Sequence, residues 1–172
     1  NGSSGYYSQG GGGRVAVYYR VNDGFSGFTT STTLGANNGT IAFLDNSQTH
    51  NRLYVYQQFP FGVDTVAVYD AITVDNGGTL SIGGGSDITV TGAVTVTGAS
   101  TILLQSKNIS GKVGDQWQGA GVTMRAANIQ VDAGSKITAD GQGYGAGLGP
   151  GTSVPVQTGG SYGGQGSAGG GP

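Results

Sequence analysis

The chain has 172 residues, of which 37 are glycine and only 9% are charged, and its acidic residues are all aspartates. The formal net charge of −2 provides no basic face for phosphate groups, which argues against nucleic-acid binding, and no run approaches the roughly 20 apolar residues of a membrane-spanning helix. The absence of cysteine excludes disulfides and thiol chemistry, and the absence of glutamate, a strong helix former, argues against an α-rich fold.

Residues 1–13 (NGSSGYYSQGGGG) form a first zone that is rich in glycine, serine and tyrosine and lacks apolar periodicity. Residues 141–172 return to the same composition and end in SYGGQGSAGGGP. Two interpretations stay open for these terminal zones: they pack against another copy of the chain, or they are flexible linkers, as is usual for Gly/Ser-rich sequence. Because the chain begins with Asn1 and shows no signal-like segment, we expect a processed chain or a piece of a longer one.

The central zone, residues 14–140, reads almost entirely as short β-strands, because runs rich in Val, Ile, Tyr and Phe alternate with Gly, Asn and Asp. The expected strands are Arg14–Arg20, Thr40–Asp45, Arg52–Gln57, Asp64–Tyr69, Ile72–Asp75, Thr79–Ile82, Asp87–Thr91, Ala93–Thr97, Ser100–Gln105, Val122–Ala126, Asn128–Asp132 and Lys136–Ala139. Their spacing is tighter than that of a sandwich or barrel. We therefore predict an all-β fold, a right-handed parallel β-solenoid (β-helix) with short rungs and glycine-rich terminal segments.

A weak internal repeat supports this prediction. ITVDNGGTL (Ile72–Leu80) and IQVDAGSKI (Ile129–Ile137) share the pattern I-x-V-D-x-G. In each copy an aspartate follows the strand, and Gly77 or Gly134 stands two residues later. Aspartate can hydrogen-bond within its own turn and glycine adopts positive φ without steric cost, so these positions are predicted to form corners between strands.

The sequence from Asp70 to Gly145, which includes DAITVDNGGTLSIGGGSDITVTGAVTVTG and GVTMRAANIQVDAGSKITADGQGYG, resembles the glycine-rich β-solenoid repeats of very large bacterial cell-surface and secreted proteins. In those repeats such segments precede a glycine-rich loop, then GGSYGGQG-like sequence and GGGRVAVYY. Here the last two motifs stand at opposite ends, as Gly159–Gly166 and Gly11–Tyr19. The resemblance covers most of the chain and implies an extracellular scaffold, adhesin or fibre. It carries no catalytic residues across.

The inventory of catalytic residues is poor. His50 lies in the loop sequence DNSQTHNR and is expected to be solvated. The nearest approach to the acidic clusters of polysaccharide-cleaving enzymes is Asp132 with Lys136 and Asp140. Glycoside hydrolysis needs two carboxyl groups at a defined separation across the sugar, which this pattern does not establish. We predict that the chain is not an enzyme and that it needs no cofactor.

Two further kinds of site remain open. Calcium could take oxygen ligands from Asn22–Gly24 or from Asp45–Asn46, but turn formation explains both stretches equally well. Three N-x-[S/T] triplets, which begin at Asn1, Asn38 and Asn108, are candidate glycosylation sites. Such triplets arise often by chance in a chain rich in these residues.

The tyrosines are the candidate contact residues. Tyr18 and Tyr19 are consecutive on an expected strand, so they should point to opposite faces and at least one should leave the core. Exposed tyrosines can anchor a neighbouring subunit or stack on sugars, and we favour the first. The predicted subunit contacts are Tyr6, Tyr7, Tyr18, Tyr19 and Tyr162.

These observations lead to one functional hypothesis and one alternative. The first is a secreted, extracellular structural protein whose identical copies assemble head to tail into a fibre or surface array, because terminal strands expose unpaired backbone groups and few charges repel one another. The alternative is a monomeric adhesin stalk or carbohydrate-binding module whose partner is a surface polysaccharide.

Overall fold

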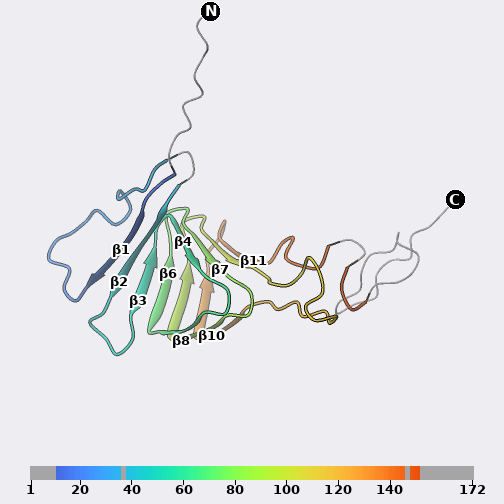
Figure 1. The fold of residues 1–172 in the computed structure, drawn as a ribbon. Coiled ribbons are helices and arrows are strands. Elements are labelled where there is room, and N and C mark those ends of the chain that lie inside the picture. Colours follow the sequence, from blue (N-terminus) through green and yellow to red (C-terminus); the bar gives the residue numbers. More distant parts are fainter. Residues whose placement is uncertain (1–10, 36–37, 146–147, 152–172) are drawn as a thin grey trace, which may run out of the picture.

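The computed structural model describes residues 11–35, 38–145 and 148–151 (Figure 1). The described part of the chain contains strands, turns and loops but no helix, so the predicted all-β character is confirmed. The strands are β1 (Arg14–Tyr19), β2 (Thr40–Asp45), β3 (Arg52–Val55), β4 (Gln58–Phe61), β5 (Val66–Tyr69), β6 (Ala71–Val74), β7 (Thr79–Ile82), β8 (Asp87–Val96), β9 (Thr101–Leu104), β10 (Thr123–Val131) and β11 (Lys136–Thr138).

The strands form two sheets. The larger sheet has the order β1-β2-β3-β6-β8-β10, and β5 pairs additionally with β8. The smaller sheet has the order β11-β9-β7-β4 and is wholly parallel. Figure 1 shows the strands of the larger sheet side by side, from β1 in blue at one end to β10 in orange at the other.

The predicted right-handed parallel β-solenoid is wrong. The larger sheet is mixed, because β2 and β3 pair antiparallel, with Leu44 opposite Leu53, and no closed solenoid is found in the described residues. The physical reason is the short connection, residues 46–51, between these two strands. A parallel pair needs a crossover of about a dozen residues or more, whereas a short loop reverses the chain. Consequently β1 and β2 run opposite to β3, β6, β8 and β10.

Apolar residues at every second strand position build the core between the two sheets. Along β6, β7 and the second half of β8, every second residue is apolar and fully buried, while the residues between them are partly exposed. In-register partners form columns that run across the strands, such as Leu53–Ile72–Val94 and Val55–Val74–Val96, all of them fully buried. Stacked β-branched and leucine side chains of this kind account for the strand preference of these runs.

The predicted corner residues are confirmed. Gly77 and Gly134 both have positive φ, at 71° and 81°, and each stands two residues after an aspartate that directly follows a strand. The corner of the next layer contains Gly98, whose φ is 61° and whose carbonyl accepts a hydrogen bond from the Gly77 amide at 2.7 Å. The corners therefore stack on one another in the same way as the strands.

Apart from shifts of one or two residues at strand ends, the structure differs from the predicted strands in three places. The expected strands 87–91 and 93–97 are one continuous strand, β8, and 122–126 and 128–132 are likewise joined in β10, with a register irregularity between Ala126 and Asn128. Strand β4 was not predicted, because its Pro60 weakens the strand pattern. Pro60 fits because β4 is an edge strand of the smaller sheet, where a missing N–H is tolerated.

Candidate functional site

The first end of the larger sheet is the strand β1. Among the described residues, β1 pairs with β2 only, in parallel, so the backbone groups along its other side are unpaired with any strand. Its side chains are exposed on both faces, including Val15, Val17 and Tyr18. A strand edge of this kind is a template for pairing with another strand.

The position of β1 follows from its pairing with β2. Ala16 and Tyr18 are in register with Ala42 and Leu44, which belong to the core cluster, so they lie on the core side of the sheet. Val17 is in register with Phe43 on the opposite side. We call these the core side and the outer side of the sheet. Tyr18 is 62% exposed although it faces the core side, because no strand formed by the described residues lies beyond β1.

The second end of the larger sheet is the strand β10. Ile129 and Val131 continue two core columns, since they are in register with Val94 and Val96 of β8. The β8 residues are fully buried, whereas Ile129 is 48% and Val131 is 42% exposed. In the smaller sheet, β11 is also an edge strand, and its half-buried Ile137 continues a column behind the fully buried Ile102. The core thus reaches the surface at this end.

A shallow hollow lies beside β1 on its core side. It has a volume of about 330 Å³ and is lined by Arg14, Ala16, Thr40, Phe59 and Pro60, among others. Phe59 packs against Phe61 edge to face, with ring centroids 5.5 Å apart. The first end therefore combines an unpaired strand with an apolar floor that β4 provides.

A cluster of aromatic rings lies on the outer side next to β1. Phe28, from the connection between β1 and β2, packs edge to face on Phe43 at 4.8 Å and on Phe25 at 4.9 Å between centroids. Tyr19 contacts Phe28 at 5.9 Å. Burial, followed by the neighbouring Tyr54 and Asp45, raises the pKa of Tyr19 to about 12.

This cluster borders a hollow of about 140 Å³ between β1 and the following loop. Besides aromatic rings, Asn22 and Asp23 line it. The Asn22 side chain is engaged in its own turn, because its Oδ1 accepts a hydrogen bond from the Phe25 amide at 2.8 Å. Sequence reasoning missed this cluster, since Phe25 and Phe28 stand in a loop without periodicity and meet Phe43 only through the fold.

The predicted contact residues fall into two groups. Tyr18 and Tyr19 lie on β1 and point to opposite sides, with Tyr18 exposed and Tyr19 half-buried, as expected. Tyr6, Tyr7 and Tyr162 lie outside the described residues. Contact of any of these tyrosines with a neighbouring subunit stays a prediction.

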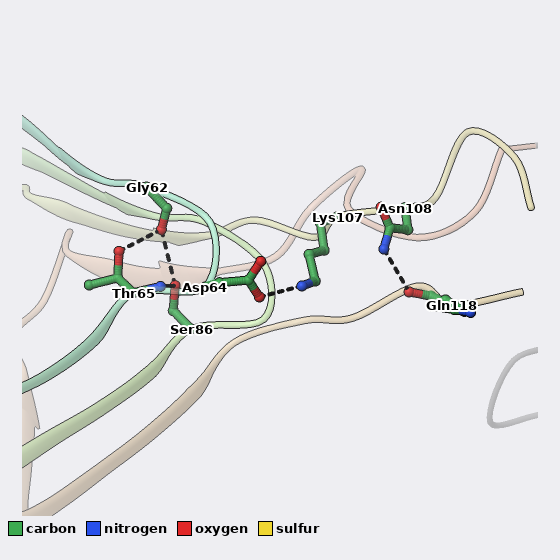
Figure 2. Close-up of polar contacts among 7 residues, drawn as sticks. All are labelled: Gly62, Asp64, Thr65, Ser86, Lys107, Asn108 and Gln118. Atoms are coloured by element: carbon green, nitrogen blue, oxygen red, sulfur yellow. Dashed lines mark hydrogen bonds and ion pairs between the residues drawn. The ribbon is translucent and has the colours of Figure 1, made fainter. Parts of the chain in front are cut away.

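The candidate glycosylation sites are similarly divided. Asn38 is exposed, and Asn1 lies outside the described residues. Asn108 is half-buried with φ of 56°, and its Nδ2 donates a hydrogen bond to the Gln118 carbonyl at 3.3 Å (Figure 2). The Asn108 amide nitrogen therefore has a structural role in joining two segments, and of these three asparagines Asn38 is the one shown to be exposed.

His50 is held by a carboxylate, so the expectation of a simply solvated histidine needs correction. Its Nδ1 lies 3.2 Å from Oδ1 of Asp70, and its backbone N–H donates to Oδ2 at 2.9 Å. Thr91 donates its hydroxyl to the same carboxylate at 2.9 Å. The backbone N–H of His50, followed by the Thr91 hydroxyl, lowers the pKa of Asp70. The arrangement ties a loop to a corner between strands and leaves both side chains partly exposed.

Two of the acidic residues proposed for catalysis or calcium, Asp132 and Asp45, have local structural partners. Asp132 accepts hydrogen bonds from Thr97 at 2.7 Å and from Gln130 at 2.9 Å, which together lower its pKa, Gln130 contributing more. Asp45 accepts from the Ser47 amide at 2.9 Å. Within the described ranges there is no group of three or more His, Asp or Glu side chains that could hold a metal ion. Calcium binding stays a prediction.

Two segments, the connection between β9 and β10 and the chain that follows β11, extend from the sheets on the side away from β1 (Figure 1). They are held together by Trp117 and Tyr144, whose rings pack edge to face at 5.3 Å, and by the Tyr144 hydroxyl, which accepts a hydrogen bond from the Gly119 amide at 2.6 Å. Figure 2 shows the base of this extension, where Lys107 forms an ion pair with Asp64. Sequence reasoning missed these contacts, which join residues far apart in the chain.

Comparison with known proteins adds no further assignment: no family model, curated protein or solved structure matches this chain. Within the described residues, no helix is long and apolar enough to cross a membrane.

Proposed function

We propose that this chain is a non-enzymatic, extracellular structural protein whose identical copies join head to tail into a fibre or surface array. The observation that supports the proposal is the contrast within single columns of the core. Val94 and Val96 are fully buried between neighbouring strands, whereas Ile129 and Val131, one strand further, are about half exposed. An added strand beyond β10 would bury them in the same manner. The extracellular location rests on the resemblance of the glycine-rich motifs to bacterial surface proteins.

The energetics favour such a contact. Burying a whole isoleucine or valine side chain contributes about 1.5–3 kcal/mol, so half-exposed core residues at an end have part of that free energy still to gain. Within the described part of the chain, β1 and β10 each pair along one side only, so the backbone groups on their other sides would gain hydrogen bonds in the same step. With a formal net charge of −2 for 172 residues, repulsion between copies is small.

Electron microscopy of negatively stained full-length chain at increasing concentration tests the proposal. We expect filaments from the unmodified chain and their loss in Val131→Lys, because a lysine on an edge strand opposes strand addition. The matched control is Val113→Lys, since Val113 is exposed to a similar extent, 44%, but lies in the extension and not at a sheet end. Dispersed monomers of the unmodified chain at every concentration would contradict the proposal.

A carbohydrate-binding module is the second candidate, and the aromatic hollow next to β1 favours it. Exposed aromatic rings stack on the apolar faces of sugars, and a nearby carboxylate accepts hydrogen bonds from sugar hydroxyls. Phe25 is exposed at the rim and Asp23 lines the same hollow. Titration calorimetry with neutral oligosaccharides should then give heat of binding that Phe25→Ala abolishes and Val113→Lys leaves unchanged. Heat that is equal for all three proteins would argue against this site.

A further inference from the structure

We propose that the head-to-tail contact is an antiparallel strand pair, in which β1 of one copy adds to β10 of the next with Ala16 opposite Val131 and Tyr18 opposite Ile129. This inference rests on the proposed function and specifies its interface. The occupant of each sheet end is a second copy of this chain.

Strand direction within one copy sets the orientation. Because β2 and β3 are antiparallel, β1 runs opposite to β10 within the same sheet. When a second copy continues the sheet in the same sense, its β1 therefore lies antiparallel to the β10 of the first copy. Antiparallel pairing is slightly more stable per residue than parallel pairing, so the reversal at residues 46–51 favours strand addition at this junction.

The two sides of the sheet set the register. On β1, Ala16 and Tyr18 face the core side, and on β10, Ile129 and Val131 do. Directly opposite residues of an antiparallel pair point to the same side, so pairing Ala16 with Val131 and Tyr18 with Ile129 makes one apolar layer from both copies. A shift of one residue would place Tyr18 on the side of the polar Asn128 and Gln130.

Charge favours this pairing over a twofold pair of two β1 strands. Arg14 begins β1, and Asp132 directly follows β10. The antiparallel arrangement therefore brings these oppositely charged residues to the same end of the paired strands. In an antiparallel pair of two β1 strands, Arg14 of each copy would instead approach Arg20 of the other, since Arg14 begins the strand and Arg20 directly follows it. Like charges at such short range destabilise strand pairs.

Cross-linking tests the orientation directly, because the chain has no cysteine of its own. Two single variants, Ala16→Cys and Val131→Cys, are prepared as full-length chains and oxidised separately and as an equal mixture. Both positions are exposed, so neither change disturbs the core. We expect disulfide-linked dimers in the mixture and monomers in each separate sample. The double variant should give a ladder of covalent oligomers.

A second pair of mixtures tests the register. Val17→Cys with Gln130→Cys lies on the outer side and is directly opposed in the proposed pairing, so it should also cross-link. Val17→Cys with Val131→Cys places the sulfurs on opposite sides and should cross-link at least tenfold more slowly. Equal rates for these two mixtures would overturn the register.

Light scattering on the unmodified chain measures whether copies assemble, independently of which strands form the contact. Assembly without a cross-link between Ala16→Cys and Val131→Cys overturns the β1–β10 interface and leaves the structural function standing. Dimers in the Ala16→Cys sample alone overturn it in favour of a twofold contact. The absence of any assembly by the unmodified chain contradicts the proposed function itself.

Discussion

The middle and the ends of the larger sheet are made of the same kinds of residue but have different exposures. Ile72 in β6 and Ile129 in β10 occupy one column, because both are in register with Val94. Each of them is the first residue of the sequence pattern I-x-V-D-x-G. Ile72 is fully buried and Ile129 is 48% exposed. The difference comes from the number of neighbouring strands and not from the residue. In the part of the chain that the structure describes, an end strand of this sheet is thus a core strand with a neighbour on one side only.

The largest effect is expected on the free energy of unfolding when each of these two isoleucines is replaced by alanine. Ile72→Ala should lower the free energy of unfolding by about 2–5 kcal/mol, because it leaves a cavity in a packed core. Ile129→Ala should cost less than about 1.5 kcal/mol in the monomer, because its side chain is already half in water. Urea denaturation at low protein concentration measures both. Equal losses would show that β10 is already covered in the monomer.

A smaller effect on stability is expected when alanine replaces each of two corner glycines. Gly98 and Gly134 both have positive φ, so alanine at either position costs roughly 1–2 kcal/mol of backbone strain. A Cβ on Gly98 would also lie 2.7 Å from the backbone nitrogen of Asn76, whereas a Cβ on Gly134 would meet nothing within 4 Å. Thermal unfolding should therefore show Gly98→Ala to be clearly less stable than Gly134→Ala. Equal melting temperatures for the two variants would contradict the expected difference between the middle and the end of the sheet.

The smallest effect concerns the carboxylate of Asp70, which accepts hydrogen bonds from both neighbouring segments. Because these bonds lower the pKa of Asp70 in the folded chain, their stabilising contribution is complete above the unfolded value of about 3.9 and is lost as the pH falls below it. The unfolding free energy should decrease from pH 5 to pH 3, and Asp70→Asn should flatten this decrease. Thr91→Val removes one of the bonds and should give an intermediate slope. An unchanged slope in Asp70→Asn would contradict the assignment.

The sequence allowed the strands and corners to be predicted, because these depend on local chemistry. Runs of β-branched residues marked most strands, and Gly77 and Gly134 marked two corners. Strand direction is different, since alternation of apolar residues is identical in parallel and antiparallel strands. The reversal between β2 and β3 is therefore not visible in the apolar alternation, and the signal that could have predicted it is the short connection between the expected strands Thr40–Asp45 and Arg52–Gln57.

The candidate site was predictable only in part, for a related reason. Tyr18 was found because consecutive residues of a strand must point to opposite sides. The contact of His50 with Asp70 and that of Trp117 with Tyr144 join residues 20 and more positions apart, so spacing along the chain gave no sign of them. The exposure of Ile129 depends on where the sheet ends, which no local pattern specifies.

Hydrogen–deuterium exchange across a concentration series tests most directly whether the two sheet ends receive a neighbouring strand. Amides of Arg14–Tyr19 and of the second half of β10, Asn128–Val131, should exchange more slowly as the concentration rises, while those of Ala71–Val74, already paired on both sides, should not change. Protection that increases at both ends together is the result we expect. Exchange at β1 and β10 that is independent of concentration would contradict assembly through these strands.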